Sequence, residues 1–228
     1  MTTSEPYFDG REMYMFHDMF RREFSLMPGL VRGVTAGDQK RTQIISGHIA
    51  NVNSVLHAHH GSEDKHVWPL LHDRGPEDVA AIVQLMESQH AELEKTASEA
   101  DEAVAAWRSS ATAGTRDALA STLDNLIPLL KAHMAAEEEH VVPLMEQHIT
   151  AAEWIRMAGE GAADVDPETL ILGFGMVMYE GDPEIIDITV KNLPEEVRPV
   201  IRQLASQAFA AHAELVHGTA TPPRSTEL

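Results

Sequence analysis

Apolar residues recur every three or four positions along the first two-thirds of the chain, and this spacing is typical of amphipathic helices. The pattern predicts four long helices, at about residues 11–26, 38–71, 76–107 and 115–149. Pro28 is expected to end the first, Asp38 to cap the second and Pro128 to bend the fourth. Because the connections are short, we expect residues 1–150 to form an all-α, up-down-up-down four-helix bundle.

The last third of the chain predicts shorter helices. Suitable N-caps for three of them are Thr150, Asp166 and Asp182. A final amphipathic helix is expected from about Pro194 to Gly218. Residues 151–218 are therefore predicted to form a C-terminal helical extension that packs over one end of the bundle. Residues 219–228 are predicted to be a disordered tail.

One stretch of the second predicted helix occurs again in the fourth. Aligned without a gap, the residues Ala58, His59, Glu63, His66, Val67, Pro69 and Leu70 recur as Ala132, His133, Glu137, His140, Val141, Pro143 and Leu144. In each copy the first histidine and the glutamate are four residues apart, so they share one face of a helix. Two such helices facing each other would bring two imidazoles and two carboxylates to one buried point, which predicts a metal site.

The repeat extends to the preceding helix of each pair. His17 precedes His59 by 42 residues, and His90 precedes His133 by 43 residues. The two halves therefore resemble copies of one helical hairpin, and a pseudo-twofold axis between them would generate a nearly symmetric two-metal site. The proline of each copy is expected to bend its helix at the same height.

Composition limits the possible classes of function. Hydrophobic residues make up 43% of the 228 residues, enough for a sizeable core, but no apolar run is long enough for a membrane span. The formal net charge of −19, from 17 basic and 36 acidic residues, argues against a nucleic-acid partner. Without cysteine, a metal must be held by nitrogen and oxygen, and the 13 histidines supply nitrogen. The amino terminus lacks the pattern of a signal peptide, so a cytoplasmic location is expected.

The doubled His-x-x-x-Glu motif with its trailing proline resembles the hemerythrin-like family, the HHE cation-binding domain, over roughly the first two-thirds of the chain. The extension resembles C-terminal regions of actinobacterial hemerythrin-like proteins. The family resemblance implies a four-helix bundle that holds two non-haem iron ions, bridged by two carboxylates and an oxygen. The implied iron ligands are His17, His59, Glu63, His90, His133 and Glu137. A symmetric allocation puts His17 with His133 on one iron. His59 and His90 then ligate the other, and both glutamates span the pair.

The remaining histidines and acidic residues have simpler interpretations. His66 and His140 are expected to orient ligands or line the entrance to the site. The histidines expected at the surface are His57, His60, His72 and His148. The acidic residues expected to form a solvated face are Asp64, Glu138 and Glu139. Oxygen-carrying hemerythrins have a second histidine on the third helix, and Glu94 occupies that position here, which weakens an inference of reversible oxygen carriage.

Imidazole and carboxylate ligands suit iron, zinc or manganese. A ferritin-like di-iron site is the competing architecture, because Glu63-x-x-His66 and Glu137-x-x-His140 match its Glu-x-x-His signature. That site also needs a glutamate from each remaining helix, where this chain has His17 and His90. The sequence thus predicts a non-haem di-iron protein that binds or reacts with dioxygen, nitric oxide or hydrogen peroxide. Alternatives are a di-iron oxidase, peroxidase or catalase-like enzyme, and an iron-storage or structural metal-binding protein.

Overall fold

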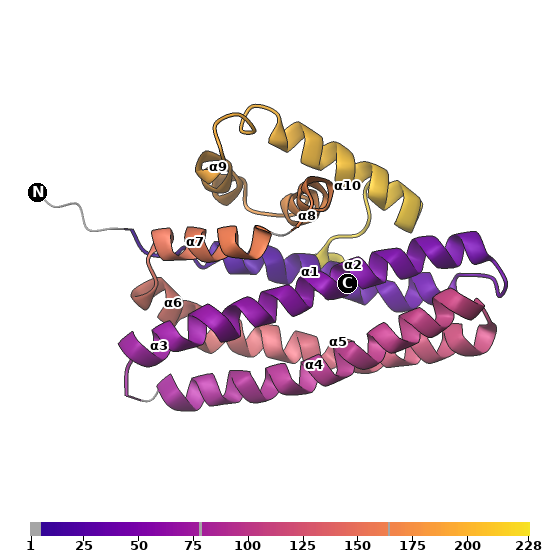
Figure 1. Cartoon of the computed structure of the whole chain (residues 1–228), viewed down its shortest axis with the longest axis horizontal. Coiled ribbons are helices and arrows are strands. Elements are labelled where there is room, and N and C mark those ends of the chain that lie inside the picture. Colours follow the sequence, from indigo (N-terminus) through magenta and orange to yellow (C-terminus); the bar gives the residue numbers. More distant parts are fainter. Residues whose placement is uncertain (1–5, 78, 164) are drawn as a thin grey trace, which may run out of the picture.

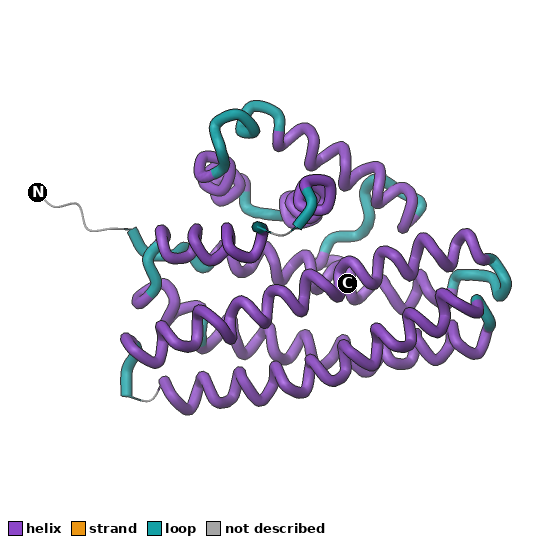
Figure 2. The backbone as a smooth tube through the Cα atoms, in the orientation of Figure 1, coloured by secondary structure: helices purple, strands orange, loops and turns teal. Residues whose placement is uncertain are grey.

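Four long helical rods make up most of the molecule in the computed structural model, which describes residues 6–77, 79–163 and 165–228 (Figure 1). The rods are α1 (Arg11–Arg32); α2 (Gln39–Ser62) continued by the π-helical turn η1 (Glu63–Val67) and α3 (Trp68–Arg74); α4 (Val79–Ser110); and α5 (Ala113–His140) continued by α6 (Val142–His148). α1 and α4 each pack against both α2 and α5, so consecutive rods are neighbours. The predicted all-α bundle is confirmed, and short loops join its rods (Figure 2).

The C-terminal extension lies along one flank of the bundle. Its elements are α7 (Ala151–Ala162), α8 (Pro167–Met178), α9 (Pro183–Asn192), α10 (Ile201–His217) and the 3-10 turn η2 (Ser225–Glu227). The three predicted N-caps each accept a hydrogen bond from a backbone N–H of the first turn. α8 packs against α1, and α10 packs against α2, so the extension covers a side of the bundle (Figure 1). The expectation that it covers one end is wrong.

α1 continues past Pro28 to Arg32, although the proline was expected to end it. A proline inside a helix removes a hydrogen bond and clashes with the preceding turn, at a cost of about 3 kcal/mol. Met27 and Val31 flank it and are fully buried, and burying each such side chain contributes about 1.5–3 kcal/mol. Core packing therefore outweighs the proline.

The segment before α10 also differs from the prediction. The helix begins at Ile201 and not near Pro194. A second proline, Pro199, disfavours the helical conformation at Arg198, so residues 195–200 form turns. The end of the helix agrees with the prediction, because Gly218 takes the left-handed conformation, with φ 75°, that terminates many helices.

The last residues are held against the fold, in contrast to the predicted disordered tail. The Tyr179 hydroxyl donates a 2.8 Å hydrogen bond to the Pro222 carbonyl. The backbone N–H and hydroxyl of Ser225 each donate a 2.8 Å bond to Glu180 Oε2. The segment has no hydrophobic periodicity, and its order comes from long-range polar contacts that local sequence does not reveal.

Two apolar clusters fill the interior of the bundle. One includes Phe20, Leu56, Leu93 and Leu130 and continues into the extension through Phe209. The other lies near α3, α6 and α7 and includes Phe8, Met13, Val67, Met86 and Met145. The first cluster therefore joins the extension to the bundle in one hydrophobic core.

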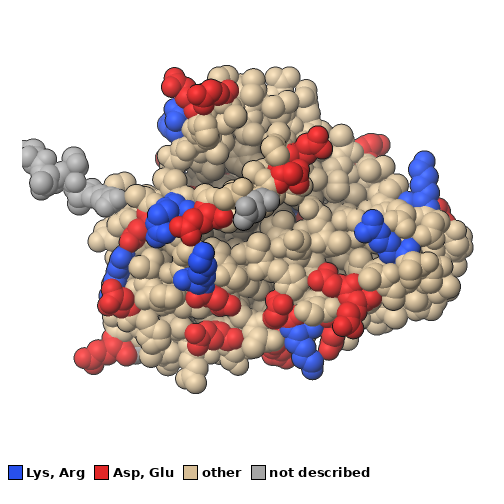
Figure 3. Space-filling model, viewed as in Figure 1, with Lys and Arg blue, Asp and Glu red and all other residues tan. Residues whose placement is uncertain are grey.

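Acidic side chains outnumber basic ones on the face shown in Figure 3, in keeping with the net charge of −19. Among the described residues, no helix combines the length and the apolar character needed to cross a bilayer.

The contact of α8 with α10 depends on Gly175, which yields a prediction. A Cβ there would lie 2.2 Å from the Ala205 carbonyl oxygen, whereas a Cβ at Gly173 would meet nothing within 4 Å. We expect Gly175→Ala to lower the free energy of unfolding by about 1–3 kcal/mol through overpacking. The control Gly173→Ala should be neutral or stabilising by up to about 1 kcal/mol. Urea unfolding followed by circular dichroism measures both, and equal losses would contradict the close packing.

Candidate metal centre

The six predicted site residues lie together in a polar layer between the two apolar clusters. In α1 the layer falls between Met13 and Phe20, and in α4 it falls between Met86 and Leu93. The residues brought together are His17 from α1, His59 from α2, Glu63 from η1, His90 from α4, and His133 and Glu137 from α5. Both glutamates and three of these histidines are fully or almost fully buried, and His59 is mostly buried. The prediction that all four rods contribute to one point agrees with this arrangement.

Two donor groups form around the carboxylates. The first contains His17, His59 and Glu137, and the second contains His60, Glu63, His90 and His133. Glu63 is within reach of both, because its Oε1 lies 3.1 Å from His59 Nε2 and its Oε2 lies 3.5 Å from His90 Nε2. Glu137 Oε2 likewise lies 3.3 Å from His17 Nε2 and 3.6 Å from His133 Nε2. Each carboxylate thus adjoins imidazoles of both groups.

The spatial grouping of the histidines differs from the predicted allocation, which places His17 with His133 and His59 with His90. His17 belongs with His59, and His90 belongs with His133, whose Nε2 atoms are 3.3 Å apart. The sequence repeat specifies equivalent positions, but it does not specify how close the imidazoles at those positions lie to one another.

His60, predicted to be a surface residue, is buried and is part of the second group. Its ring stacks on that of His90 with centroids 4.3 Å apart and meets the His133 ring edge-on at 5.0 Å. The search for repeated residues missed it because Met134 occupies the equivalent position in the second copy. Helical spacing could have found it, since Leu56, His60 and Glu63 follow one buried stripe of the helix.

The helical hydrogen-bond pattern is interrupted at the same place in both copies of the motif. In the first copy the π-helical turn η1 begins at Glu63, and the Trp68 N–H bonds to the Glu63 carbonyl. In the second copy Val141 separates α5 from α6. Each interruption precedes the motif proline, which cannot donate a backbone hydrogen bond. Such π turns occur frequently at functional sites.

Asp64 and Glu138 are not simply part of a solvated acidic face, as the sequence suggested. Asp64 Oδ1 accepts a 2.7 Å hydrogen bond from His90 Nδ1, and Glu138 Oε1 accepts a 2.7 Å bond from His17 Nδ1. The two acidic residues are equivalent in the repeat, each following its motif glutamate. Gln89 Oε1 accepts a comparable bond of 3.1 Å from His133. With the proton on Nδ1, the Nε2 lone pair of each ring points towards the other donors.

Six of the buried donor atoms that face the centre lack hydrogen-bond partners. Among the described residues, both carboxylate oxygens of Glu63 and of Glu137 are buried without one, as are Nε2 of His17 and of His59. Burial, followed by the negative charge of Glu137, raises the pKa of Glu63 well above its usual value. Such groups are costly to bury unless a cation binds them. The donors therefore fit bound metal ions.

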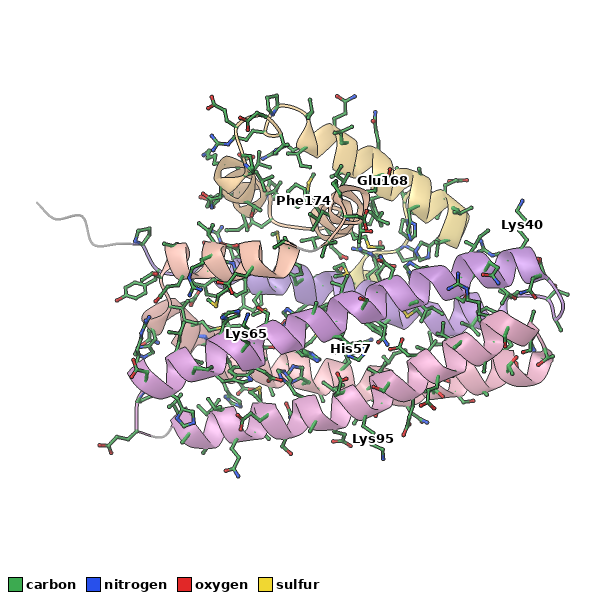
Figure 4. All side chains as sticks on the ribbon, viewed as in Figure 1. Lys40, His57, Lys65, Lys95, Glu168 and Phe174 are labelled. Atoms are coloured by element: carbon green, nitrogen blue, oxygen red, sulfur yellow. The ribbon has the colours of Figure 1, made fainter. Side chains whose placement is uncertain are left out.

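Other predicted residues lie outside both groups. His66 Nε2 is 3.4 Å from Glu160 of α7, and His140 is exposed. Glu94 bonds to His57 Nδ1 at 2.7 Å at the surface of the bundle, where Figure 4 labels His57. Glu94 therefore does not join the donor groups, and His60 is the additional residue of the second group.

His59 should couple stability to pH in the metal-free protein. Burial lowers its pKa from 6.5 to about 3. Between these values the unfolded chain binds a proton that the folded protein does not. The free energy of unfolding should therefore fall as the pH falls below 6.5, by about 1.4 kcal/mol per pH unit for one group. His59→Gln should give a shallower dependence between pH 6.5 and 4.5 in urea unfolding. Parallel curves for the two proteins would contradict the buried, neutral state of His59.

Comparison with known proteins identifies the family. A family model described as the hemerythrin HHE cation binding domain matches residues 11–145, which contain all six predicted site residues and His60. A second match covers residues 81–165 and begins in α4, as a duplicated hairpin would produce. Neither the curated proteins nor the solved structures gave a match. Since the first match covers more than half of the chain, the protein belongs to the hemerythrin HHE cation-binding domain family.

Proposed function

We propose that this protein holds two non-haem iron ions and binds or reacts with dioxygen, nitric oxide or hydrogen peroxide at them. The supporting observation is that Glu63 and Glu137 each adjoin imidazoles of both donor groups. Carboxylates in this position can bridge two ions, as in other two-metal sites. The bundle, residues 1–150, is the part that holds the ions, and residues 151–218 form an extension on its α1 and α2 flank.

The facing imidazoles support occupation by cations. His90 and His133 both have an acceptor at Nδ1, so in their neutral forms both Nε2 lone pairs face each other at 3.3 Å. Two lone pairs repel unless a cation lies between or beside them. Imidazole and carboxylate suit iron, and bound iron would supply redox chemistry and a coordination position for a small molecule. The residues themselves fix the direction of their lone pairs, and the apolar clusters on both sides of the layer limit its contact with water.

The donor groups differ in their number of imidazoles. The group with His60 offers three, and the group with His17 offers two. If both carboxylates are shared, the ion held by His17 and His59 keeps one more position free. Phe16 and Phe20 lie against His59, with ring centroids 6.1 and 5.4 Å away. This apolar surrounding disfavours charged molecules and suits a small uncharged one.

A pocket of about 490 Å³ between α2 and α4 leads to the donors. It reaches His60 and His90, and its lining includes Asp64 and Glu94. The acidic lining would attract cations and repel anions. It therefore suits entry of metal ions and of uncharged molecules the size of a diatomic or peroxide.

Iron content tests the shared carboxylates. The aerobically purified protein should contain about two irons per chain, as expected of a two-metal site. Glu63→Ala or Glu137→Ala should remove most of both irons, because each carboxylate adjoins both donor groups. Elemental analysis measures the content. A full pair of irons in either variant would contradict the bridging role.

Iron content measured after exposure of the protein to a chelator tests whether His60 is a ligand. His60→Ala removes a donor and should lose iron faster than the wild type. His57→Ala removes the neighbouring histidine, which bonds to Glu94 and Asp101 at the surface, and should retain iron. His66→Ala and His140→Ala should also retain it. Equal retention by His60→Ala and His57→Ala would exclude His60 as a ligand.

Absorption spectra test the reaction with small molecules. The reduced, iron-loaded protein should change its ultraviolet-visible spectrum on addition of dioxygen, nitric oxide or hydrogen peroxide. A change that reverses on removal of the molecule indicates binding, and repeated consumption of peroxide indicates catalysis. An unchanged spectrum with all three, in protein that contains two irons, would contradict the proposed function.

A further inference from the structure

A second buried cluster of potential ligands lies between the bundle and the extension. Glu23 of α1, His48 of α2 and His217 of α10 meet there, with side chains 0%, 0% and 5% exposed. Glu23 Oε2 is 3.3 Å from His48 Nε2 and 3.4 Å from His217 Nε2. The three residues are far apart in the sequence and come together only because α10 packs against α2.

The three facing atoms lack hydrogen-bond partners among the described residues. Their separations resemble the 3.1–3.6 Å distances in the bundle centre. Two donor atoms bound to one tetrahedral ion, each about 2.1 Å from it, lie about 3.4 Å apart. The cluster therefore has the spacing of ligands around a single ion.

We propose that Glu23, His48 and His217 bind a divalent transition-metal ion, zinc or ferrous iron, separate from the pair in the bundle. Two imidazoles and one carboxylate form a donor set that both metals use. Along α1, Glu23 lies about 9 Å from His17 by the helical rise. The two sites therefore share no ligand.

Neighbouring residues orient the three ligands. The fully buried Arg22 donates from Nε and Nη2 to Glu23 Oε1, at 2.9 and 2.8 Å, and leaves Oε2 free. His212 Nε2 lies 3.0 Å from His48 Nδ1. When His48 carries its proton on Nδ1 and donates a hydrogen bond to His212 Nε2, the lone pair of His48 Nε2 faces Glu23. This is the usual arrangement of a metal-bound histidine and its outer partner.

Hydrogen bonding within the cluster is the alternative explanation, because a neutral histidine that carries its proton on Nε2 could donate to Glu23 Oε2. The Nε2 atoms of His48 and His217 lie 3.3 and 3.4 Å from this oxygen, but neither contact has the geometry of a hydrogen bond. Buried polar atoms without a partner are costly. A metal ion accepts lone pairs from all three atoms at once.

The ion would have a route to the site and a structural consequence. A surface pocket of about 340 Å³ has His217 and Arg41 in its lining. Arg41 also donates to the carbonyls of Leu215 and Val216, which fixes the last turn of α10 on α2. Metal binding would join α1, α2 and α10, so it should strengthen the docking of the extension.

The test is a titration of the iron-loaded protein with Zn²⁺ by calorimetry, and with Co²⁺ by visible absorption. The wild type should bind one additional ion of either metal. His48→Gln and His217→Gln should weaken this binding at least 100-fold and leave the iron pair in place. His72→Gln, which removes an exposed histidine at the end of α3, should bind like the wild type. Elemental analysis of protein taken directly from cells distinguishes bound zinc from a third iron.

Two further measurements test the site without the His48 and His217 variants, which could fail to fold. Crystals of the wild type soaked in Zn²⁺ should give an anomalous peak between Glu23, His48 and His217. Glu63→Ala, which is expected to lose the iron pair, should still bind the additional ion. The proposal is overturned if the wild type binds no ion beyond the pair, if the peak is absent, or if both histidine variants bind as the wild type does.

Discussion

The bundle is organised around the burial of two carboxylates that have no hydrogen-bond partner among the described residues. Glu63 and Glu137 lie in the centre of the bundle, where each carboxylate adjoins imidazoles of both donor groups. Removing an ionised carboxylate from water costs several kcal/mol. Five imidazoles converge on them from four helices. Apolar clusters on both sides of this layer exclude water, which increases the cost of the unpaired groups and the gain from a cation. A bound cation would therefore stabilise the closed bundle.

The two copies of the sequence repeat build similar donor groups, but one position differs between them. The equivalent residues Asp64 and Glu138 accept hydrogen bonds from Nδ1 of His90 and of His17, so the acceptor that orients each candidate ligand is duplicated together with it. At the position that directly follows the motif histidine, the first copy has His60 and the second has Met134. A single substitution between the copies is enough to give one donor group three imidazoles and the other two. Under the proposed function, asymmetry of this kind would direct a small molecule to one side of the site.

Much of the architecture could be predicted because it depends on local rules. Helical periodicity gave the four rods, the N-caps of the extension follow from residue type, and the duplicated motif identified six residues that do meet. The grouping of the histidines could not be predicted, because it depends on where each imidazole lies in the tertiary structure. His60 was missed because a search for repeats ignores residues that occur in one copy. Pro28 was misjudged because the burial of Met27 and Val31 is a property of the tertiary structure.

α1 is the element through which the bundle and the extension share one core. Its sequence suggests a single apolar stripe, yet Arg22 and Glu23 on another face are as fully buried as Phe20 and Phe24. Arg22 bonds to Glu23, to Glu180 and to the Met176 carbonyl, so charged groups of α1 are matched only when the end of α8 is in its observed place. An apolar contact of similar size would tolerate sliding of the helices, whereas a buried charge left unmatched costs several kcal/mol. The polar contacts therefore fix the register of the extension, and the hydrophobic core supplies most of its affinity for the bundle.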